Sequence, residues 1–302
     1  MDTDVLLEVK NVTKKVRGRT LLHDVSFGVR KGEICGFLGP NGAGKTTMIR
    51  VMTGLIAPSQ GEVRINGISV QQNRQRALSS LGAIVESPLF FPYLSGRKAL
   101  GNLSRLHPNL SRKEQKKQVE KVLELVGLKD RGNDKVGTYS LGMKQRLGIA
   151  QALLGKPEVI ILDEPANGLD PIGMRFLREL ILKLRDEEGL TFLISSHLLD
   201  ELQQVCDRLV MIKEGSLVWE GDSDELAGGV TWVFTVGNVD LALQAIGNAY
   251  PVKCLDDRQL EIVIEEDQVG HVSRLMMAQG IDVMGIEKRT RRLEDAFVEM
   301  MS

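Results

Sequence analysis

The stretch "GPNGAGKTT", residues 39–47, decides the fold. It matches the pattern GxxxxGK[ST] through Gly39, Gly44, Lys45 and Thr46. In this pattern the glycines let backbone N–H groups wrap phosphate oxygens, the lysine neutralises their charge, and the hydroxyl binds Mg²⁺. A plain glycine-rich turn is the alternative, but an apolar run precedes the stretch and "TTMIRVMTGL" follows with helical spacing. The candidate nucleotide-binding residues here are Gly39, Pro40, Asn41, Gly42, Ala43, Gly44, Lys45, Thr46 and Thr47.

Two acidic residues end a second informative run. In "EVIILDEP", residues 158–165, four apolar residues lead into Asp163 and Glu164, and open α/β sheets bind their ligands at the carboxyl ends of strands. We expect Asp163 to hold Mg²⁺ through water and Glu164 to polarise the attacking water. An acidic pair in such a place is more often a solvated turn, but the phosphate loop upstream favours the catalytic interpretation.

His197 follows "TFLISS", another apolar run. A lone histidine in such a place is more often a hydrogen-bonded structural residue. Here it would follow a third strand of the same sheet, after the strands that lead to the phosphate loop and to Asp163. Because these three strand ends would meet at one γ-phosphate, His197 is a candidate catalytic residue.

A second possible phosphate grip lies in "TYSLGMKQRLGIAQALL", residues 138–154. Ser140 and Gly142 precede an apolar helix, and the N–H groups and dipole of a helix N-terminus favour an anion. The phosphate loop is already complete without them. The sequence therefore raises the question why one chain carries two grips for one nucleotide.

In order and separation, these motifs resemble those of the ATP-binding subunits of ABC transporters. The resemblance covers residues from about 5 to 222 and rests on "GPNGAGKTT", the loop "VESPLFFPYLS", the signature "YSLGMKQR", "ILDEPANGLDP" and the histidine after "TFLISS". It implies an ATPase that uses ATP and Mg²⁺ and packs head to tail with a second ATPase subunit; we expect a homodimer, with a heterodimer as the alternative. Each ATP would lie between one chain's phosphate loop and the other's signature. Ser140, Gly142 and Met143 would then bind the partner's ATP, and Asp170 would act at the seam as a further catalytic residue.

The sequence departs from the family pattern at three places. The signature, usually LSGGQ, reads YSLGM over residues 139–143 and keeps the serine and second glycine. Val16 stands where the family stacks an aromatic ring on adenine, which predicts weak base recognition. Glu86 replaces a glutamine, and we expect it to ligate Mg²⁺ and act in catalysis, with neutral drift in a loop as the alternative. Together with "ESPLFFPYL", Glu86 resembles the branch linked to bacitracin resistance and lantibiotic self-immunity.

The expected fold class is α/β. A P-loop ATPase domain over residues 1–222 would have a mainly parallel sheet, an antiparallel β portion and a helical insert at about 88–155. Within it, "HDVSFGVRKGEICGFLG" is expected to be a strand that runs straight into the glycine loop. Glycines at 228–229 mark a boundary. A small α+β, ferredoxin-like domain over residues 223–302 would follow, with the order βαββαβ and a closing helix "RRLEDAFVEMM".

Composition excludes several classes of function. Lys plus Arg total 39 and Asp plus Glu total 40 in 302 residues, a net charge of −1, so we expect no nucleic-acid partner. The 3 cysteines are scattered and form no CxxC, which argues against a disulfide framework or zinc site and for a reduced cytosol. No apolar run approaches the roughly 20 residues needed to span a bilayer. We therefore expect a soluble chain.

An ATPase of this kind needs a separate membrane permease, so we expect it in the cytoplasm, peripheral on the inner face of the cell membrane. The branch resemblance implies export or removal of an antimicrobial peptide or drug. "SPLFFPYL", residues 87–94, is the expected dock, although Leu89, Phe90 and Phe91 could equally pack under the helical insert. The alternative is a soluble ABC-type ATPase that acts on ribosomes or nucleic acid. Such proteins generally carry two ATPase domains, a long coiled coil or a basic linker, which this sequence does not show.

Overall fold

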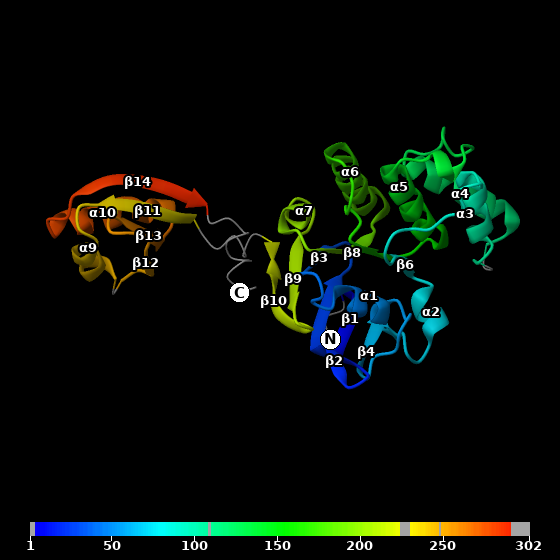
Figure 1. Cartoon of the computed structure of the whole chain (residues 1–302), viewed down its shortest axis with the longest axis horizontal. Helices are drawn as coiled ribbons and strands as arrows, with labels where there is room; N and C mark the ends of the chain where they lie inside the picture. Colours follow the sequence, from blue (N-terminus) through cyan, green and yellow to red (C-terminus); the bar gives the residue numbers. More distant parts are fainter. Residues whose placement is uncertain (1–3, 108–109, 224–229, 248, 291–302) are drawn as a thin grey trace. The chain divides into compact units, whose positions relative to one another are not determined.

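The chain folds into two compact units, Met1–Gly221 and Asp222–Ser302 (Figure 1). The first unit contains all the motifs described above, and its strands and helices position them. The second is a small α+β unit with a core of its own. The computed structural model describes residues 4–107, 110–223, 230–247 and 249–290.

A six-stranded sheet forms the centre of the first unit; its strands are β3 (Ile34–Leu38), β6 (Leu81–Ile84), β7 (Val159–Asp163), β8 (Thr191–Ser196), β9 (Arg208–Lys213) and β10 (Ser216–Asp222). Their spatial order is β10-β9-β3-β8-β7-β6, and the neighbours from β9 to β6 are parallel. Every residue of β3, β7 and β8 is buried, as expected for strands covered on both faces. Because these three strands are parallel and consecutive, the chain segments that leave their carboxyl ends start at one edge of the sheet.

A second, antiparallel sheet is made of β1 (Val5–Val16), β2 (Arg19–Arg30), β4 (Gln60–Ile65) and β5 (Ile68–Ser69), in the order β2-β1-β4-β5. It is the antiparallel portion that the sequence predicts. The expectation of one strand running into the glycine loop is wrong, because Lys31 and Gly32 form a turn that separates β2 from β3. The reason is topological: β2 pairs antiparallel with β1, whereas β3 pairs parallel with β8 and β9.

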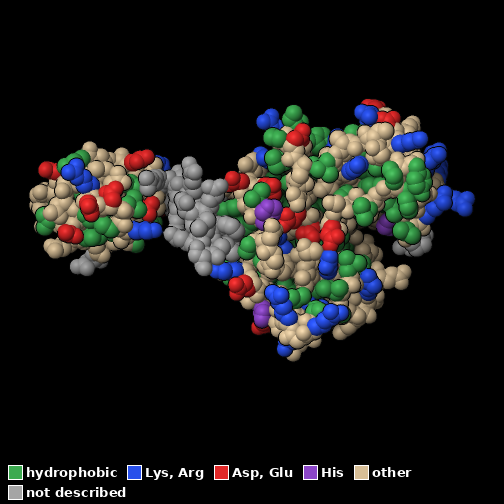
Figure 2. Space-filling model, in the orientation of Figure 1, with side chains coloured by type: hydrophobic (Ala, Val, Ile, Leu, Met, Phe, Trp, Pro, Cys, Tyr) green, Lys and Arg blue, Asp and Glu red, His purple; other side chains and the backbone are tan. Residues whose placement is uncertain are grey.

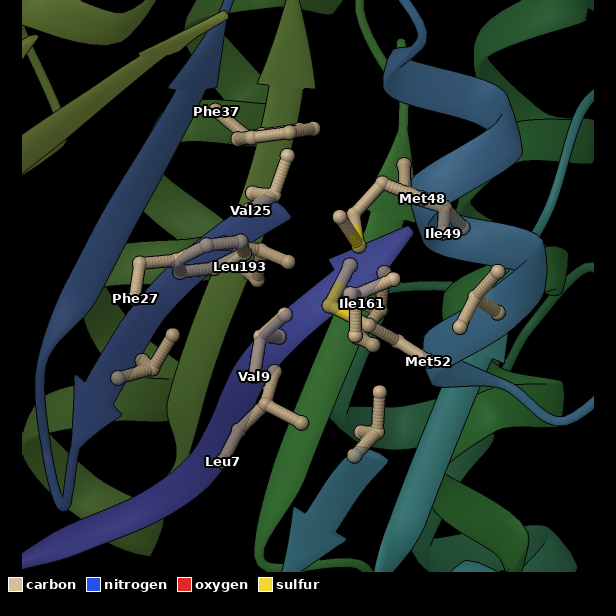
Figure 3. Close-up of a cluster of buried hydrophobic side chains, with 14 of the residues drawn as sticks. Leu7, Val9, Val25, Phe27, Phe37, Met48, Ile49, Met52, Ile161 and Leu193 are labelled. Atoms are coloured by element: carbon tan, nitrogen blue, oxygen red, sulfur yellow. The ribbon is translucent and has the colours of Figure 1, made fainter. Parts of the chain in front are cut away.

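The helix α1 (Lys45–Met52) shares one apolar core with both sheets. Its residues Met48 and Met52 are fully buried and, at a spacing of four, lie on one face of the helix. Figure 3 shows these two side chains beside Val9 of β1 and Ile161 of β7. The phosphate loop is therefore anchored at both ends, by β3 before it and α1 after it.

Further helices in the described part of this unit are α2 (Arg74–Leu78), α3 (Gly96–Ser104), α4 (Arg112–Leu125), α5 (Leu141–Ala152), α6 (Pro171–Glu188) and α7 (Leu199–Gln203). The helices α3, α4 and α5 lie in the predicted helical insert, and they contact one another. Helix α4 begins with a capping box: the Ser111 hydroxyl accepts a hydrogen bond from the Glu114 N–H at 3.3 Å, and the Glu114 carboxylate accepts one from the Ser111 N–H at 2.8 Å.

The second unit has the elements β11 (Val230–Val236), α9 (Val239–Ile246), β12 (Val252–Cys254), β13 (Gln259–Val263), α10 (Val269–Ala278) and β14 (Val283–Thr290). This is the βαββαβ order that the sequence predicts. The strands lie in the order β12-β13-β11-β14, and all neighbours are antiparallel. Phe234, Ile262 and Met276 are among the buried residues that join this sheet to its helices. The predicted boundary at residues 228–229 and the predicted closing helix at 291–301 lie outside the described residues.

Candidate active site

The phosphate loop leaves β3 and turns directly into α1. A Cβ atom at Gly39 would lie 2.4 Å from the Ile212 carbonyl oxygen, so only glycine fits there. Gly44 has a φ of 108°, in the region that favours glycine, and it stands at the N-cap position of α1. Since glycine has no side chain to cap the helix, the first N–H groups of α1 remain available to an anion. The cavity in front of them, of about 170 Å³, is lined by Leu21, Asn41, Gly42, Gly44, Lys45, Thr46, Thr47 and Glu164.

The Lys45 ammonium is buried within this loop. It donates to the carbonyl oxygens of Gly39 at 2.6 Å and Pro40 at 3.3 Å, and it lies 3.2 Å from Glu164 Oε1. An ammonium has three donors, and these three acceptors match them. The lysine is therefore fixed at the cavity wall with its charge balanced by one carboxylate.

Ser195 of β8 orients both acidic residues at the end of β7. Its hydroxyl donates to Asp163 Oδ1 at 2.6 Å and accepts from the Glu164 N–H at 2.9 Å. Glu164 has a φ of 46°, an uncommon backbone conformation for a residue with a side chain. These hydrogen bonds from the neighbouring strand hold the turn in that conformation, which aims Glu164 at the cavity.

His197 lies at the other oxygen of Glu164. Its Nδ1 atom is 2.7 Å from Glu164 Oε2, so the carboxylate lies between an imidazole and the Lys45 ammonium. The turn that carries His197 is held by Ser196, whose hydroxyl donates to Glu201 at 2.6 Å. The structure thus brings together residues that follow three parallel strands, as the sequence order predicts.

The second grip lies at the N-terminus of α5. Ser140 caps this helix, because its hydroxyl accepts from the Met143 N–H at 3.3 Å. That hydrogen bond occupies the Met143 amide. Asp170 in turn caps α6, with its Oδ1 atom accepting from the Gly173 N–H at 2.7 Å. Both helix starts face a second cavity, of about 410 Å³, lined by Ser140, Leu141, Gly142, Gln145, Arg146, Gly168, Leu169, Asp170, Ile172, Gly173, Phe176 and Leu177.

Tyr139, at the first position of the signature, is a packing residue. It is buried, and its hydroxyl donates to the Arg131 carbonyl oxygen at 2.7 Å. A Cβ atom at Gly96 would lie 2.5 Å from that hydroxyl, so the ring is seated against the start of α3. Burial raises the pKa of Tyr139. The replacement of the family's leucine by Tyr139 therefore changes the packing beneath the signature. It leaves the residues that line the second cavity unchanged.

Glu86 and Val16 lie apart from these residues. Glu86 makes an ion pair with Arg50 in the last turn of α1, and its side chain is 62% exposed. Val16 ends β1 and is 43% exposed. Neither lines either of the two cavities. Within the described part of the chain, no group of three or more His, Cys, Asp and Glu side chains could by itself hold a metal ion.

Sequence reasoning missed two residues at the site, Ser195 and Gln145, and the partner of Glu86 outside it, Arg50. Ser195 had a visible signal, since a hydroxyl in a fully buried strand needs a hydrogen-bond partner. Arg50 and Gln145 had no such signal, because Arg50 pairs with Glu86, 36 residues away, and Gln145 with Pro165, 20 residues away.

No helix among the described residues is long and apolar enough to cross a membrane.

Comparisons with known proteins identify the family. The family model of ABC transporters matches residues 22–167. An uncharacterized ABC transporter ATP-binding protein of Bacillus subtilis, YhcH, is 44% identical over 98% of this chain and 95% of its own length. The bacitracin transport ATP-binding protein BcrA of Enterococcus faecalis is 37% identical over 100% of this chain and 98% of its own.

A solved structure supports the same assignment. The ATP-binding cassette MJ0796, a dimer in a post-hydrolysis state bound to ADP and Pi, matches with a TM-score of 0.64 and 26% identity over 72% of this chain and 98% of its own. The phosphate loop, the paired carboxylates and the signature helix described above fall within residues 22–167, which the family model matches. The chain therefore belongs to the ATP-binding subunits of ABC transporters, ATPases whose reaction is coupled to transport.

Proposed function

We propose that two copies of this chain close around two ATP molecules and that hydrolysis drives a separate membrane permease, which exports or removes an antimicrobial peptide or drug. One observation carries the proposal. The chain has two cavities at helix N-termini, and the residues that line one do not line the other. A single nucleotide could therefore contact both sets of residues only if the two sets came from two different chains.

In the first cavity, the N–H groups of α1 and the Lys45 ammonium would hold the phosphates. Glu164, set between Lys45 and His197, would orient the attacking water and receive its proton, while His197 would contact the γ-phosphate. A phosphate that takes Lys45 as its partner would release Glu164 from that ion pair. The carboxylate would then be available to the water.

The start of α1 and the end of β7 carry residues that fit Mg²⁺. Thr46 supplies a hydroxyl, and Asp163 supplies a carboxylate of which one oxygen is fixed by Ser195. Mg²⁺ usually takes one or two protein oxygens and completes its shell with phosphates and water, so no larger cluster of acidic residues is needed. When bound, Mg²⁺ neutralises charge on the phosphates. Glu86 would join this set only by leaving its ion pair with Arg50. Because bound Mg²⁺ would have to replace that cation, the part of Glu86 in hydrolysis would depend on the metal.

In the second cavity, Ser140 and the N–H groups of Leu141 and Gly142 would receive the phosphates of the partner's ATP. The relative MJ0796, whose structure is a dimer bound to ADP and Pi, supports this arrangement. The Ser140 hydroxyl would be shared between the helix cap and the incoming phosphate. Asp170, at the same cavity, would lie at the seam.

The loop between β6 and α3 is the proposed dock for the permease. Leu89 is 93% exposed, Phe91 64% and Tyr93 66%, while Phe90 is half-buried. The alternative, in which Leu89 and Phe91 pack beneath the helical insert, is therefore wrong for these two residues. Figure 2 shows hydrophobic side chains gathered over the region of α3 and α4, with Lys and Arg at its outer edge. Apolar side chains of this size on a loop favour a protein partner. The relative BcrA, named for bacitracin transport, supports a drug or peptide as cargo.

The test of dimerisation uses the full chain with Glu164→Gln, which blocks hydrolysis but keeps the ATP. Sedimentation should show a monomer without nucleotide and a dimer with ATP and Mg²⁺. Adding Lys45→Ala to the same variant should abolish the dimer, because the phosphates lose their cation. A chain that stays monomeric with ATP, both alone and with the co-expressed permease, would contradict the proposal.

A further inference from the structure

The buried amide of Gln145 links the signature helix α5 to the turn that carries Glu164. Gln145 is 7% exposed, and its Nε2 atom donates to the Pro165 carbonyl oxygen at 2.9 Å. The orientation of the amide follows from its partner, since only the NH₂ end can face a carbonyl oxygen. Pro165 directly follows Glu164. One hydrogen bond therefore separates the signature helix from the backbone of the candidate general base.

A second contact joins the same two segments. Gly168 has a φ of 76°, and a Cβ atom there would lie 3.2 Å from the side chain of Leu141, the first residue of α5. Within the turn, the N–H of Asn167 donates to the Glu164 carbonyl oxygen at 3.1 Å. The turn is thus internally bonded and packed on the first residue of α5. A displacement of α5 would be transmitted to Glu164 instead of being absorbed between them.

The other end of the amide lacks a partner. Gln145 Oε1 is buried and, among the described residues, accepts no hydrogen bond. Gln145 also lines the second cavity, together with Ser140, Gly142 and Asp170. Buried polar atoms are almost always paired, so the amide is held on one side only, by the hydrogen bond from Nε2 to Pro165.

We propose that Gln145 is a positioning residue that couples the two ATP sites served by one chain. The proposal rests on the proposed closure of two chains around ATP. When the partner's ATP seats on Ser140 and Gly142, α5 shifts. Through Nε2 and Pro165 the shift reaches Glu164, which belongs to the chain's own ATP. Hydrolysis at one site then depends on occupancy of the other, the two-site condition for allosteric coupling.

The chain offers a matched control. Gln118 on α4 is also buried, at 8% exposed, and its Nε2 donates to the Leu153 carbonyl oxygen at 3.1 Å. It therefore joins two segments of the helical region by the same kind of bond, without contact to the turn after β7. Gln118→Met and Gln145→Met each replace a buried amide by an apolar side chain of similar shape.

The experiment compares ATP hydrolysis by these two variants in the full chain. For Gln145→Met we expect the maximal rate to fall about tenfold or more, because Glu164 loses its alignment, while the ATP concentration at half-maximal rate changes less than about threefold. Its Hill coefficient for ATP should fall toward 1, the value for independent sites. Gln118→Met should keep both the rate and the Hill coefficient. Equal behaviour of the two variants would overturn the proposal and leave Gln145 a packing residue.

A readout without turnover uses hydrogen exchange in the Glu164→Gln background. On adding ATP, amides in both residues 140–146 and residues 164–169 should become protected. With Gln145→Met the first set should stay protected and the second should exchange as it does without ATP. If Gln145→Met fails to fold, Gln145→Asn keeps a buried amide that is one methylene too short to reach Pro165. Absence of any ATP-dependent dimer in the Glu164→Gln chain defeats the proposed function itself. A dimer of the chain that also carries Gln145→Met in which ATP still protects both sets defeats only the coupling.

Discussion

The helix starts of α1 and α5 both face a cavity, yet they are built differently. Gly44 gives α1 no cap, and Lys45 adds a full positive charge beside the open N–H groups. Ser140 caps α5 with its own hydroxyl and leaves fewer N–H groups available. The first start has open N–H groups and a cation within one chain, whereas the second has a capped end and no cation at its first position. We therefore expect the second start to supplement a site and not to bind an anion alone. If two chains close around ATP as proposed, this difference predicts an order of events, in which ATP would bind at α1 first and then be recognised by α5 of the partner.

The largest test of this difference is Lys45→Ala. Loss of the ammonium should weaken ATP binding to the isolated chain by about a hundredfold, because charge-assisted hydrogen bonds to phosphate are lost. Lys144→Ala, in the first turn of α5, should bind ATP like the unmodified chain, because Lys144 lines neither cavity. Equilibrium dialysis with labelled ATP measures both. If the two variants lost ATP affinity to a similar extent, the helix starts of α1 and α5 would not differ in how they bind ATP.

Leu89→Ser with Phe91→Ser asks whether the dock is separate from both helix starts. These side chains are 93% and 64% exposed, so the free energy of unfolding should change by less than about 0.5 kcal/mol, and ATP hydrolysis by the isolated chain should not change. Stimulation of hydrolysis by the permease in vesicles should fall roughly thirtyfold, the effect of losing a buried apolar anchor. Leu106→Ser, at a residue 74% exposed in the same insert, is the control and should retain stimulation.

Ser140→Ala separates the cap from the grip. It should leave ATP binding to the isolated chain intact but weaken the ATP-dependent dimer of the Glu164→Gln chain about tenfold, because a phosphate loses a hydroxyl donor. Ser140→Ala and Ser111→Ala each remove the N-cap of a helix and should lower the free energy of unfolding by ~1 kcal/mol. Ser111→Ala, at the N-cap of α4, should do so without weakening the dimer. Sedimentation and thermal unfolding together distinguish these effects. A dimer unaffected by Ser140→Ala would remove α5 from the site.

A smaller effect is expected at Glu86. Because Glu86 pairs with Arg50 and is largely exposed, Glu86→Ala should leave ATP binding nearly unchanged and slow hydrolysis about fivefold, with a larger loss of transport or resistance. Glu86→Gln should be milder, since an amide oxygen can still bind Mg²⁺. The Mg²⁺ dependence of hydrolysis should shift in Glu86→Ala. Unchanged hydrolysis and transport would support neutral drift and remove Glu86 from the site.

The smallest expected effect concerns the base. Val16 is exposed and not aromatic, so ATP and GTP should compete for the first cavity within about threefold. Val16→Tyr should raise ATP affinity by ~1 kcal/mol, the lower end of a base-stacking contribution. Competition binding measures both values. A strong preference for ATP in the unmodified chain would show that another side chain, such as Arg17 or Arg19, contacts the base.

Much of the site follows from local sequence, and the reason is geometric. Asp163 ends a short buried strand, Glu164 and His197 directly follow such strands, and Lys45 begins the helix after the loop that leaves β3. Parallel strands bring such positions to one edge. The capping box at Ser111 and the βαββαβ order of the second unit are equally local patterns. None of these required knowledge of which side chains touch.

What the sequence could not provide are pairings between distant segments. The Ser195 hydroxyl that holds Asp163 lies 32 residues away, and nothing local shows that their strands are neighbours. The turn between β2 and β3 was missed because an apolar run does not reveal which sheet each half enters. Whether Leu89 and Phe91 are covered depends likewise on the whole helical insert, so both alternatives stayed open until the structure showed them exposed.

The place of β3 between β8 and β9 has a consequence for synthesis of the protein. The phosphate-loop strand is translated early, yet the strands that pair with it, at residues 191–213, emerge from the ribosome much later. Until then both edges of a strand that is fully buried in the folded protein lack their ladder partners, the condition that favours mispairing with another chain. We therefore expect release-arrested nascent chains that end before residue 190 to be chaperone clients, and nucleotide binding to begin only after about residue 213 has cleared the exit tunnel.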